Sequence, residues 1–101
     1  MYVSRLSFHS LPGKVDEVQR ELRGLQEMVV AAGGGKTRIL RTTFASLGAA
    51  DIVFEQEFPD LRSMENQLQW VNDNPEFPEW RRRISTLLWQ SPKREVCSVA
   101  E

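Results

Sequence analysis

Cysteine and histidine are almost absent from this sequence of 101 residues, which holds one of each. The single cysteine, Cys97, excludes an internal disulfide framework and is typical of proteins of the reducing cytoplasm. One cysteine and one histidine, His9, on separate predicted strands do not supply the ligand set of a zinc site. We therefore predict a cytoplasmic protein that holds no metal ion and no resident cofactor.

Long apolar runs and a large net charge are missing as well. No stretch approaches the roughly 18–20 apolar residues that cross a bilayer, and residues 1–10 lack the features of a signal peptide. The formal net charge of −1 creates no field that would attract nucleic acid, and the arginines at 81–83 fan around a helix. We expect no membrane partner and no nucleic-acid partner. The length predicts a single domain over residues 1–101.

Residues 36–58 carry the clearest pattern, that of a β-hairpin. Successive side chains of a strand point to opposite faces, and β-branched and aromatic residues are frequent in residues 38–47 and 52–58. Residues 48–51 then form a short hairpin loop. One predicted face is apolar and contains Leu40, Phe44, Ile52, Phe54 and Phe58. The other face is polar and contains Arg41, Thr43, Glu55 and Glu57.

The remaining segments predict two helices and two further strands. Residues 2–10 alternate as a strand, and residues 14–32 place apolar side chains on one helical stripe that ends at the three glycines 33–35. A second helix begins at the N-cap Asp60, is interrupted at Pro75 and resumes as far as about Trp89. Residues 94–99 form the last strand. This order, βαββαβ, predicts an α+β ferredoxin-like fold with a four-stranded antiparallel sheet.

Both helices of such a fold cover the same face of the sheet, so the other face is bare. The apolar residues predicted on this face are Val3, Ile39, Val53 and either Val96 or the pair Cys97 and Val99. A face of this kind is too apolar to remain in contact with water, and packing against an identical sheet would cover it. The pattern therefore predicts a homodimer that forms through the sheet.

Short motifs along nearly the whole chain resemble those of one superfamily. The motifs are Leu11-Pro12-Gly13-Lys14, Arg41 in the second strand, Phe54-Glu55 followed by Asp60-Leu61, Asn74-Pro75-Glu76-Phe77 with Trp80, and Pro92 with Arg94-Glu95-Val96. They are similar to those of the dimeric α/β-barrel superfamily, in particular its NIPSNAP-like and antibiotic-biosynthesis-monooxygenase-like members. The resemblance implies two ferredoxin-like subunits whose sheets close a barrel. It also implies a ligand space between each sheet and its own helices, or inside the barrel.

Members of this superfamily include monooxygenases, isomerases, haem-degrading enzymes and proteins without a known activity, so the resemblance does not identify a reaction. The haem-degrading members carry a helical histidine, which neither predicted helix has. We expect a small organic ligand and leave two functions open. One is a cofactor-independent monooxygenase or isomerase-type enzyme, and the other is a non-catalytic dimeric structural or interaction module.

The polar side chains of the predicted bare face supply the candidate site. His9 would accept a proton if it lay beside a glutamate, and Arg41 would hold an anionic oxygen of a substrate. Glu55 and Glu57 lie about 7 Å apart along one strand, close enough to interact once water is excluded. We therefore predict catalytic roles for His9, Arg41 and Glu55. The predicted ligand contacts are Arg5, Thr43, Glu57, Trp70 and Trp80. One alternative is that the charges form cross-strand Arg–Glu pairs on a solvent-facing surface, and another is a salt-bridged lumen that only sets the register of the dimer. The tryptophans would then belong to the core.

Overall fold

The helices and strands follow the predicted order, with the second helix split in two. The computed structural model describes residues 1–100. Its elements are β1 (Tyr2–Phe8), α1 (Val15–Ala31), β2 (Thr37–Arg41), β3 (Ile52–Phe58), α2 (Leu61–Asn72), α3 (Phe77–Ser85) and β4 (Lys93–Ser98). The four strands form one sheet in the order β2-β3-β1-β4, and every neighbouring pair is antiparallel. The predicted ferredoxin-like fold is therefore confirmed.

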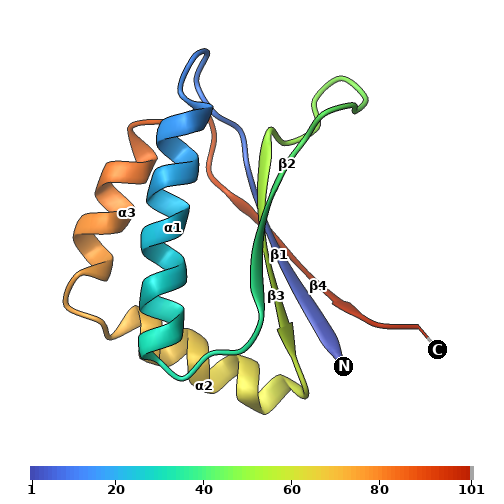
Figure 1. Cartoon of the computed structure of the whole chain (residues 1–101), viewed down its shortest axis with the longest axis vertical. Coiled ribbons are helices and arrows are strands. Elements are labelled where there is room, and N and C mark those ends of the chain that lie inside the picture. Colours follow the sequence, from blue (N-terminus) through green and yellow to red (C-terminus); the bar gives the residue numbers. More distant parts are fainter. Residues whose placement is uncertain (101) are drawn as a thin grey trace.

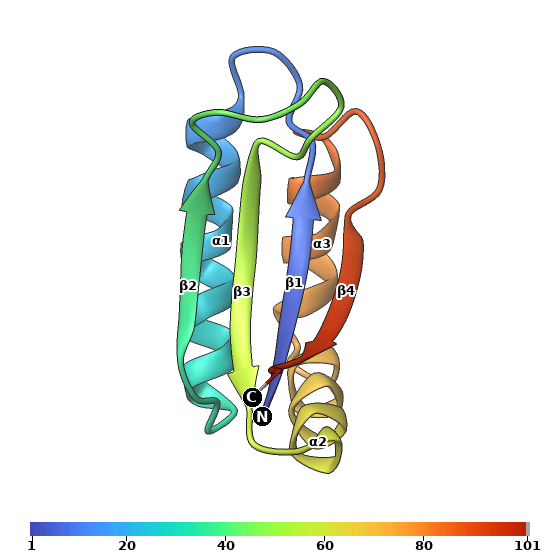
Figure 2. The same ribbon diagram turned by 90° about the vertical axis from the view of Figure 1, so that its right-hand side faces the viewer.

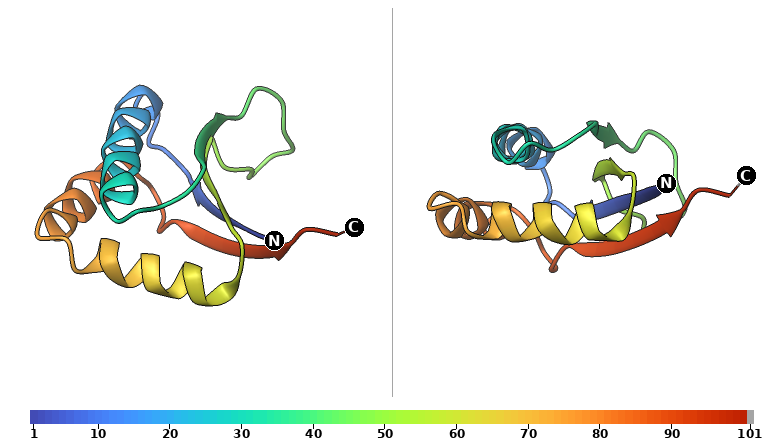
Figure 3. Two further views of the ribbon diagram at one scale, coloured as in Figure 1. Left: turned by 60° about the horizontal axis from the view of Figure 1, so that its bottom comes forward. Right: turned by 90° about the horizontal axis from the view of Figure 1, so that it is seen from below.

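The helices lie on one face of the sheet and leave the other face open. Figure 1 shows α1, α2 and α3 together on one side of the edge-on sheet. Figure 2 shows the four strands facing the viewer with the helices behind them. From below, in Figure 3, α2 runs from the end of β3 back toward α3. None of the helices within residues 1–100 is both long enough and apolar enough to cross a membrane.

The core forms where the apolar stripe of α1 meets the sheet. Val18 and Leu22 of α1 are fully buried, as are Phe8 of β1 and Ile52 of β3. The spacing of three and four residues in α1 places Leu25, Met28 and Val29 on the same buried side. Burial of a side chain of this size stabilises the fold by about 1.5–3 kcal/mol, so this layer holds α1 against the sheet.

A capping residue marks the start of α2. The carboxylate of Asp60 accepts a hydrogen bond of 2.7 Å from the backbone N–H of Ser63, as expected of an N-cap.

α3 ends at Ser85, so the prediction of a helix as far as Trp89 is wrong. The chain leaves the helix because it pairs with the end of β1. Leu87 O accepts from Leu11 N at 2.8 Å, and Trp89 N donates to the carbonyl of His9 at 3.1 Å.

The register of β2 differs from the prediction and changes which side chains share a face. Leu40 lies opposite Val53, and Arg41 lies opposite Ile52, so residues of unlike parity face each other. The side chain of Arg41 therefore points to the helix side and not to the face of Glu55, and that prediction is wrong. The same register places Ile39 on the helix side and Leu40 on the open face, the reverse of what was predicted.

The connection between β2 and β3 is longer than the predicted loop. Pairing stops at Arg41, so residues 42–51 leave the sheet and project on its open side in Figure 1. Phe44 is 94% exposed and Leu47 is 104% exposed in this connection. The prediction that Phe44 belongs to the apolar face of a long strand is therefore wrong.

Candidate functional site

A cavity of about 540 Å³ lies between the helix-covered face of the sheet and the three helices. Side chains from β1, β3 and β4 form its floor, and residues of α1, α2 and α3 form its walls. This volume falls within the range of about 300–1,000 Å³ that is typical of small-molecule sites.

One end of the cavity is polar because three neighbouring strands each place a polar side chain there. Ser4 of β1 lies opposite Gln56 of β3, and Arg94 of β4 lies opposite Leu6, two positions along β1 on the same face. Arg94 Nη1 donates a hydrogen bond to Ser4 Oγ at 2.8 Å. The amide of Gln56 donates to the side-chain carbonyl of Gln67 on α2. Ser4, Gln56 and Gln67 are each buried.

The charge of Arg94 has no internal counterion. None of the ion pairs among residues 1–100 includes this side chain. Desolvation lowers the pKa of the Arg94 guanidinium below its ordinary value, although the residue as a whole stays exposed on the edge strand. Arginine remains a cation at neutral pH even so. The polar end of the cavity therefore carries an unneutralised positive charge.

Aromatic and aliphatic side chains line the rest of the cavity. The rings of Phe77 and Trp80 stack with their centroids 5.7 Å apart and their planes at 16°. Trp80 Nε1 donates a hydrogen bond of 2.6 Å to the backbone carbonyl of Glu21, which fixes the indole between α3 and α1. A second, mainly apolar space of about 330 Å³ shares Leu6, Phe77 and Trp80 with the first and continues along α3.

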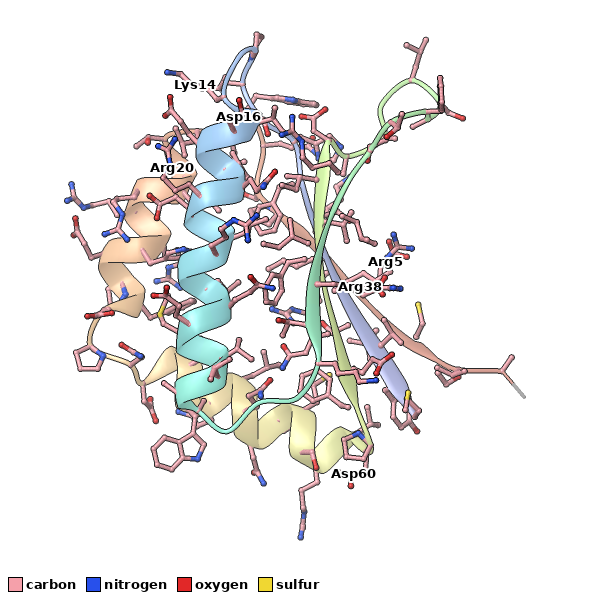
Figure 4. The ribbon with its side chains drawn as sticks, in the orientation of Figure 1. Arg5, Lys14, Asp16, Arg20, Arg38 and Asp60 are labelled. Carbon is pink, nitrogen blue, oxygen red and sulfur yellow. The ribbon has the colours of Figure 1, made fainter. Side chains whose placement is uncertain are left out.

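On the open face, one carboxylate binds two arginines. Glu55 Oε1 accepts from Arg38 Nε at 2.7 Å and lies 2.6 Å from Arg38 Nη2. Its other oxygen lies 3.5 Å from Arg5 Nε. Glu55 is 9% exposed, and Figure 4 shows Arg5 and Arg38 pointing away from the helices. The prediction placed Glu55 and Arg5 on this face but missed Arg38, because it assumed the other register for β2.

The structure does not bring His9, Arg41 and Glu55 together. His9 lies just beyond β1 and is buried, with its Nε2 3.0 Å from Gly48 O and its Nδ1 2.7 Å from Gln90 Nε2. The neutral ring with its hydrogen on Nε2 satisfies both contacts, since it donates to Gly48 O and accepts from the amide. Arg41 is on the opposite side of the sheet from Glu55 and pairs with Asp16 of α1 at 2.7 Å. The catalytic roles given to these three residues stay a prediction.

The residues predicted to contact a ligand are also dispersed. Thr43 lies in the connection after β2, and Glu57 lies on the open face opposite Val3. Trp70 is 68% exposed on α2, whereas Trp80 lines the cavity. Four polar residues at the polar end of the cavity were not among the predicted site residues, namely Ser4, Gln56, Gln67 and Arg94. Ser4 and Gln56 interrupt apolar positions of their strands, and such interruptions are the signal that would have found them.

The fold matches solved structures over nearly the whole chain. A NIPSNAP domain protein from Burkholderia xenovorans matches with a TM-score of 0.74 at 17% identity, covering 99% of this chain and 95% of that chain. An antibiotic biosynthesis monooxygenase matches with a TM-score of 0.69 at 16% identity, covering 100% of both chains. A conserved protein from Methanosarcina mazei Go1 matches with a TM-score of 0.66 at 16% identity, covering 96% of this chain and 91% of that one.

These similarities lie in the structure and not in the sequence. No protein-family model matches the chain, and no curated protein matches it. The predicted resemblance to NIPSNAP-like and antibiotic-biosynthesis-monooxygenase-like proteins is confirmed as a likeness of fold.

Proposed function

We propose that this chain is a homodimer that binds a small organic molecule in the cavity between its sheet and its helices. The observation that carries the proposal is the cavity itself, which is large enough for such a molecule and joins a polar end to aromatic walls. Contact between water and the apolar walls is unfavourable. An apolar ligand group that displaces this water would therefore bind with a gain in free energy.

The open face supports the dimer. Val3 and Leu40 are half-buried apolar side chains between the charges of this face, and Phe44 and Leu47 expose nearly all of their side chains on the same side. Exposed apolar surface rimmed by polar residues is typical of an interface between proteins. A second sheet packed on this face would cover both the strands and the connection at residues 42–51.

In its enzymatic form, the proposal is a cofactor-independent monooxygenase or isomerase-type reaction. Replacement of His9, Arg41 or Glu55 by alanine tests the predicted catalytic roles. Loss of turnover without loss of the dimer is the expected result for His9 and Arg41. Glu55 also holds Arg5 and Arg38, so turnover of Glu55→Ala is compared per folded dimer. A non-catalytic dimeric module is the second candidate. It is favoured by the ion pairs of Glu55 with Arg5 and Arg38, because these pairs already engage both carboxylate oxygens with side chains of the same chain.

A cavity-filling substitution tests the ligand site. Leu68 of α2 is half-buried in the cavity wall, so Leu68→Trp should fill the space and abolish the thermal stabilisation that a bound compound produces. Arg62→Trp, on the same helix but outside the cavity lining, is the matched control and should leave binding unchanged. The compounds to screen are aromatic polyketides, quinones and small organic acids. Unchanged binding in Leu68→Trp would refute the cavity as the ligand site.

Sedimentation analysis tests the dimer separately. A particle of twice the subunit mass at micromolar concentration is expected, and a lone subunit under the same conditions would contradict the proposed assembly.

A further inference from the structure

We infer that the ligand of this cavity is a monocarboxylic acid with an aromatic body, held through its carboxylate by Arg94 and Ser4. This inference rests on the proposed function and adds the chemical class of the ligand. Its basis is the contrast between a polar end that offers donors and a cation and the apolar walls that continue from it.

The hydrogen bonds at the polar end leave donors facing the cavity. Among residues 1–100, the Arg94 side chain makes one hydrogen bond, from Nη1 to Ser4 Oγ. The remaining N–H groups of the guanidinium are therefore free, and they form the planar fork that matches a carboxylate. Because Ser4 Oγ already accepts from Arg94, its own hydrogen can be donated to a ligand oxygen. Both groups thus favour an acceptor in the ligand.

The charges around the cavity favour one negative charge on the ligand. Its charged lining residues are Arg81, Arg94 and Glu65, which together carry a net charge of +1. Arg81 lies with its guanidinium carbon 5.7 Å from the centroid of the Phe77 ring, at the aromatic wall. A phosphate monoester carries about −1.5 to −2 charges at neutral pH and would exceed this balance. A carboxylate matches it.

The walls favour a flat apolar body. The stacked rings of Phe77 and Trp80 present an aromatic surface, and the hydrogen bond from Trp80 to Glu21 O holds that surface in place. The adjoining space of about 330 Å³ extends the apolar region along α3 beyond these rings. A ring system stacked on a fixed aromatic pair gains free energy beyond that of its buried area.

Matched pairs of compounds test this inference. Benzoic, naphthoic and anthracene-carboxylic acids would be titrated by calorimetry against the full chain beside their primary amides, which keep the shape but lose the charge. We expect at least one acid to bind about 10–100-fold more tightly than its amide, because charge-assisted hydrogen bonds contribute that much. Arg94→Gln should remove this preference and leave the affinity for the amide unchanged. Arg62→Gln removes a positive charge outside the cavity lining and should leave the preference intact.

Two further variants test whether the preference for the acid depends on the planar geometry of the Arg94 guanidinium or only on its positive charge. Arg94→Lys keeps the positive charge but loses the planar fork, so a partial preference is expected. Ser4→Ala should weaken the acid more than the amide, because a hydrogen bond to a charged oxygen is stronger than one to a neutral carbonyl. If neutral compounds bind in the cavity while no acid exceeds its amide, the inference fails and the proposed function stands. If Arg94→Gln and Arg62→Gln lower acid binding equally, the inference also fails. If no compound binds the wild-type protein, the proposed function fails together with this inference.

Discussion

The two faces of the sheet both hold arginine beside polar residues, but their charges are balanced differently. On the open face, Glu55 binds Arg5 and Arg38, so the carboxylate is neutralised within the chain. On the helix side, Arg94 bonds only to the hydroxyl of Ser4 and has no carboxylate partner among residues 1–100. Glu55 is buried and has its counterions within the chain, whereas Arg94 is exposed on the edge strand and keeps N–H groups that a ligand can use.

This difference assigns different tasks to the two faces. Because Glu55 is already paired with two arginines, another protein surface can cover this carboxylate without leaving it unpaired, which suits the proposed interface. An unneutralised cation beside apolar walls suits a molecule that brings its own negative charge. The strand pleat produces the separation, because alternate residues of β1, such as Ser4 and Arg5, point to opposite faces.

The largest effect is expected from Glu55→Gln, which breaks the balance on the open face. If a second subunit covers this face, Arg5 and Arg38 lose their shared counterion in a desolvated site, and the free energy of unfolding should fall by about 3–5 kcal/mol. Urea unfolding at fixed protein concentration measures this loss. Glu57→Gln is the control on the same strand, since Glu57 forms no ion pair among residues 1–100, and it should cost less than about 0.5 kcal/mol. A loss below about 1 kcal/mol in Glu55→Gln is typical of exposed pairs and would mean that the face stays in water.

Gly34→Ala disturbs the helix side instead. A Cβ at this position would overlap the amide nitrogen of Gln67 and Cγ1 of Val29, and would lie 2.8 Å from the carbonyl of Val29. Because the backbone must move as well as the side chains, we expect the free energy of unfolding in urea to fall by about 1–3 kcal/mol. The hydrogen bond between Gln56 and Gln67 at the polar end of the cavity should also be disturbed. Gly35→Ala is the neighbouring control, since its Cβ would meet only Glu57 O at 3.8 Å. Equal costs in the two variants would contradict this explanation.

Local patterns in the sequence predicted most of the fold. The three- and four-residue spacing of α1, the N-cap at Asp60 and the alternation in β3 each depend on neighbours in the chain, and each appears in the structure where it was predicted. The order of these elements was then sufficient to predict a ferredoxin-like sheet, because few arrangements bury all their apolar stripes.

The faces of β2 and β4 were not predictable in the same way. Whether Arg41 or Arg38 lies beside Glu55 depends on which residue of β2 pairs with Ile52, and the two strands are separated in the chain by the ten residues 42–51. A shift of one residue moves every side chain to the other face. The cavity depends likewise on the pairing of β1 with β4, so Arg94 was recognised only as part of a strand motif.

Trp80→Phe tests how much the cavity wall contributes to stability and to ligand binding. The smaller ring keeps the stacking on Phe77 but loses the hydrogen bond to the carbonyl of Glu21, so a loss of about 1–2 kcal/mol in urea unfolding is expected. Trp70→Phe is the matched control on an exposed position and should change stability by less than about 0.5 kcal/mol. Binding of aromatic acids should weaken in the first variant only. A larger loss in Trp70→Phe would place the important tryptophan elsewhere, for instance in an unrecognised interface.

The smallest effect is expected from Asp60→Ala, at the start of the helix that carries Gln67. The backbone and side chain of Ser63 donate hydrogen bonds that lower the pKa of the Asp60 carboxyl. A lowered pKa in the folded state means that the ionised group stabilises the fold above its unfolded pKa of about 3.9, and that this contribution is lost as the pH falls through the folded value. The difference in Tm between the wild type and Asp60→Ala should therefore be constant from about pH 5 to pH 8 and shrink below about pH 4. Asp60→Asn keeps the capping oxygen without the charge, so its Tm should lie between the two at neutral pH. If the difference in Tm grew as the pH fell, the ionised Asp60 carboxylate would not be the group that stabilises the start of α2.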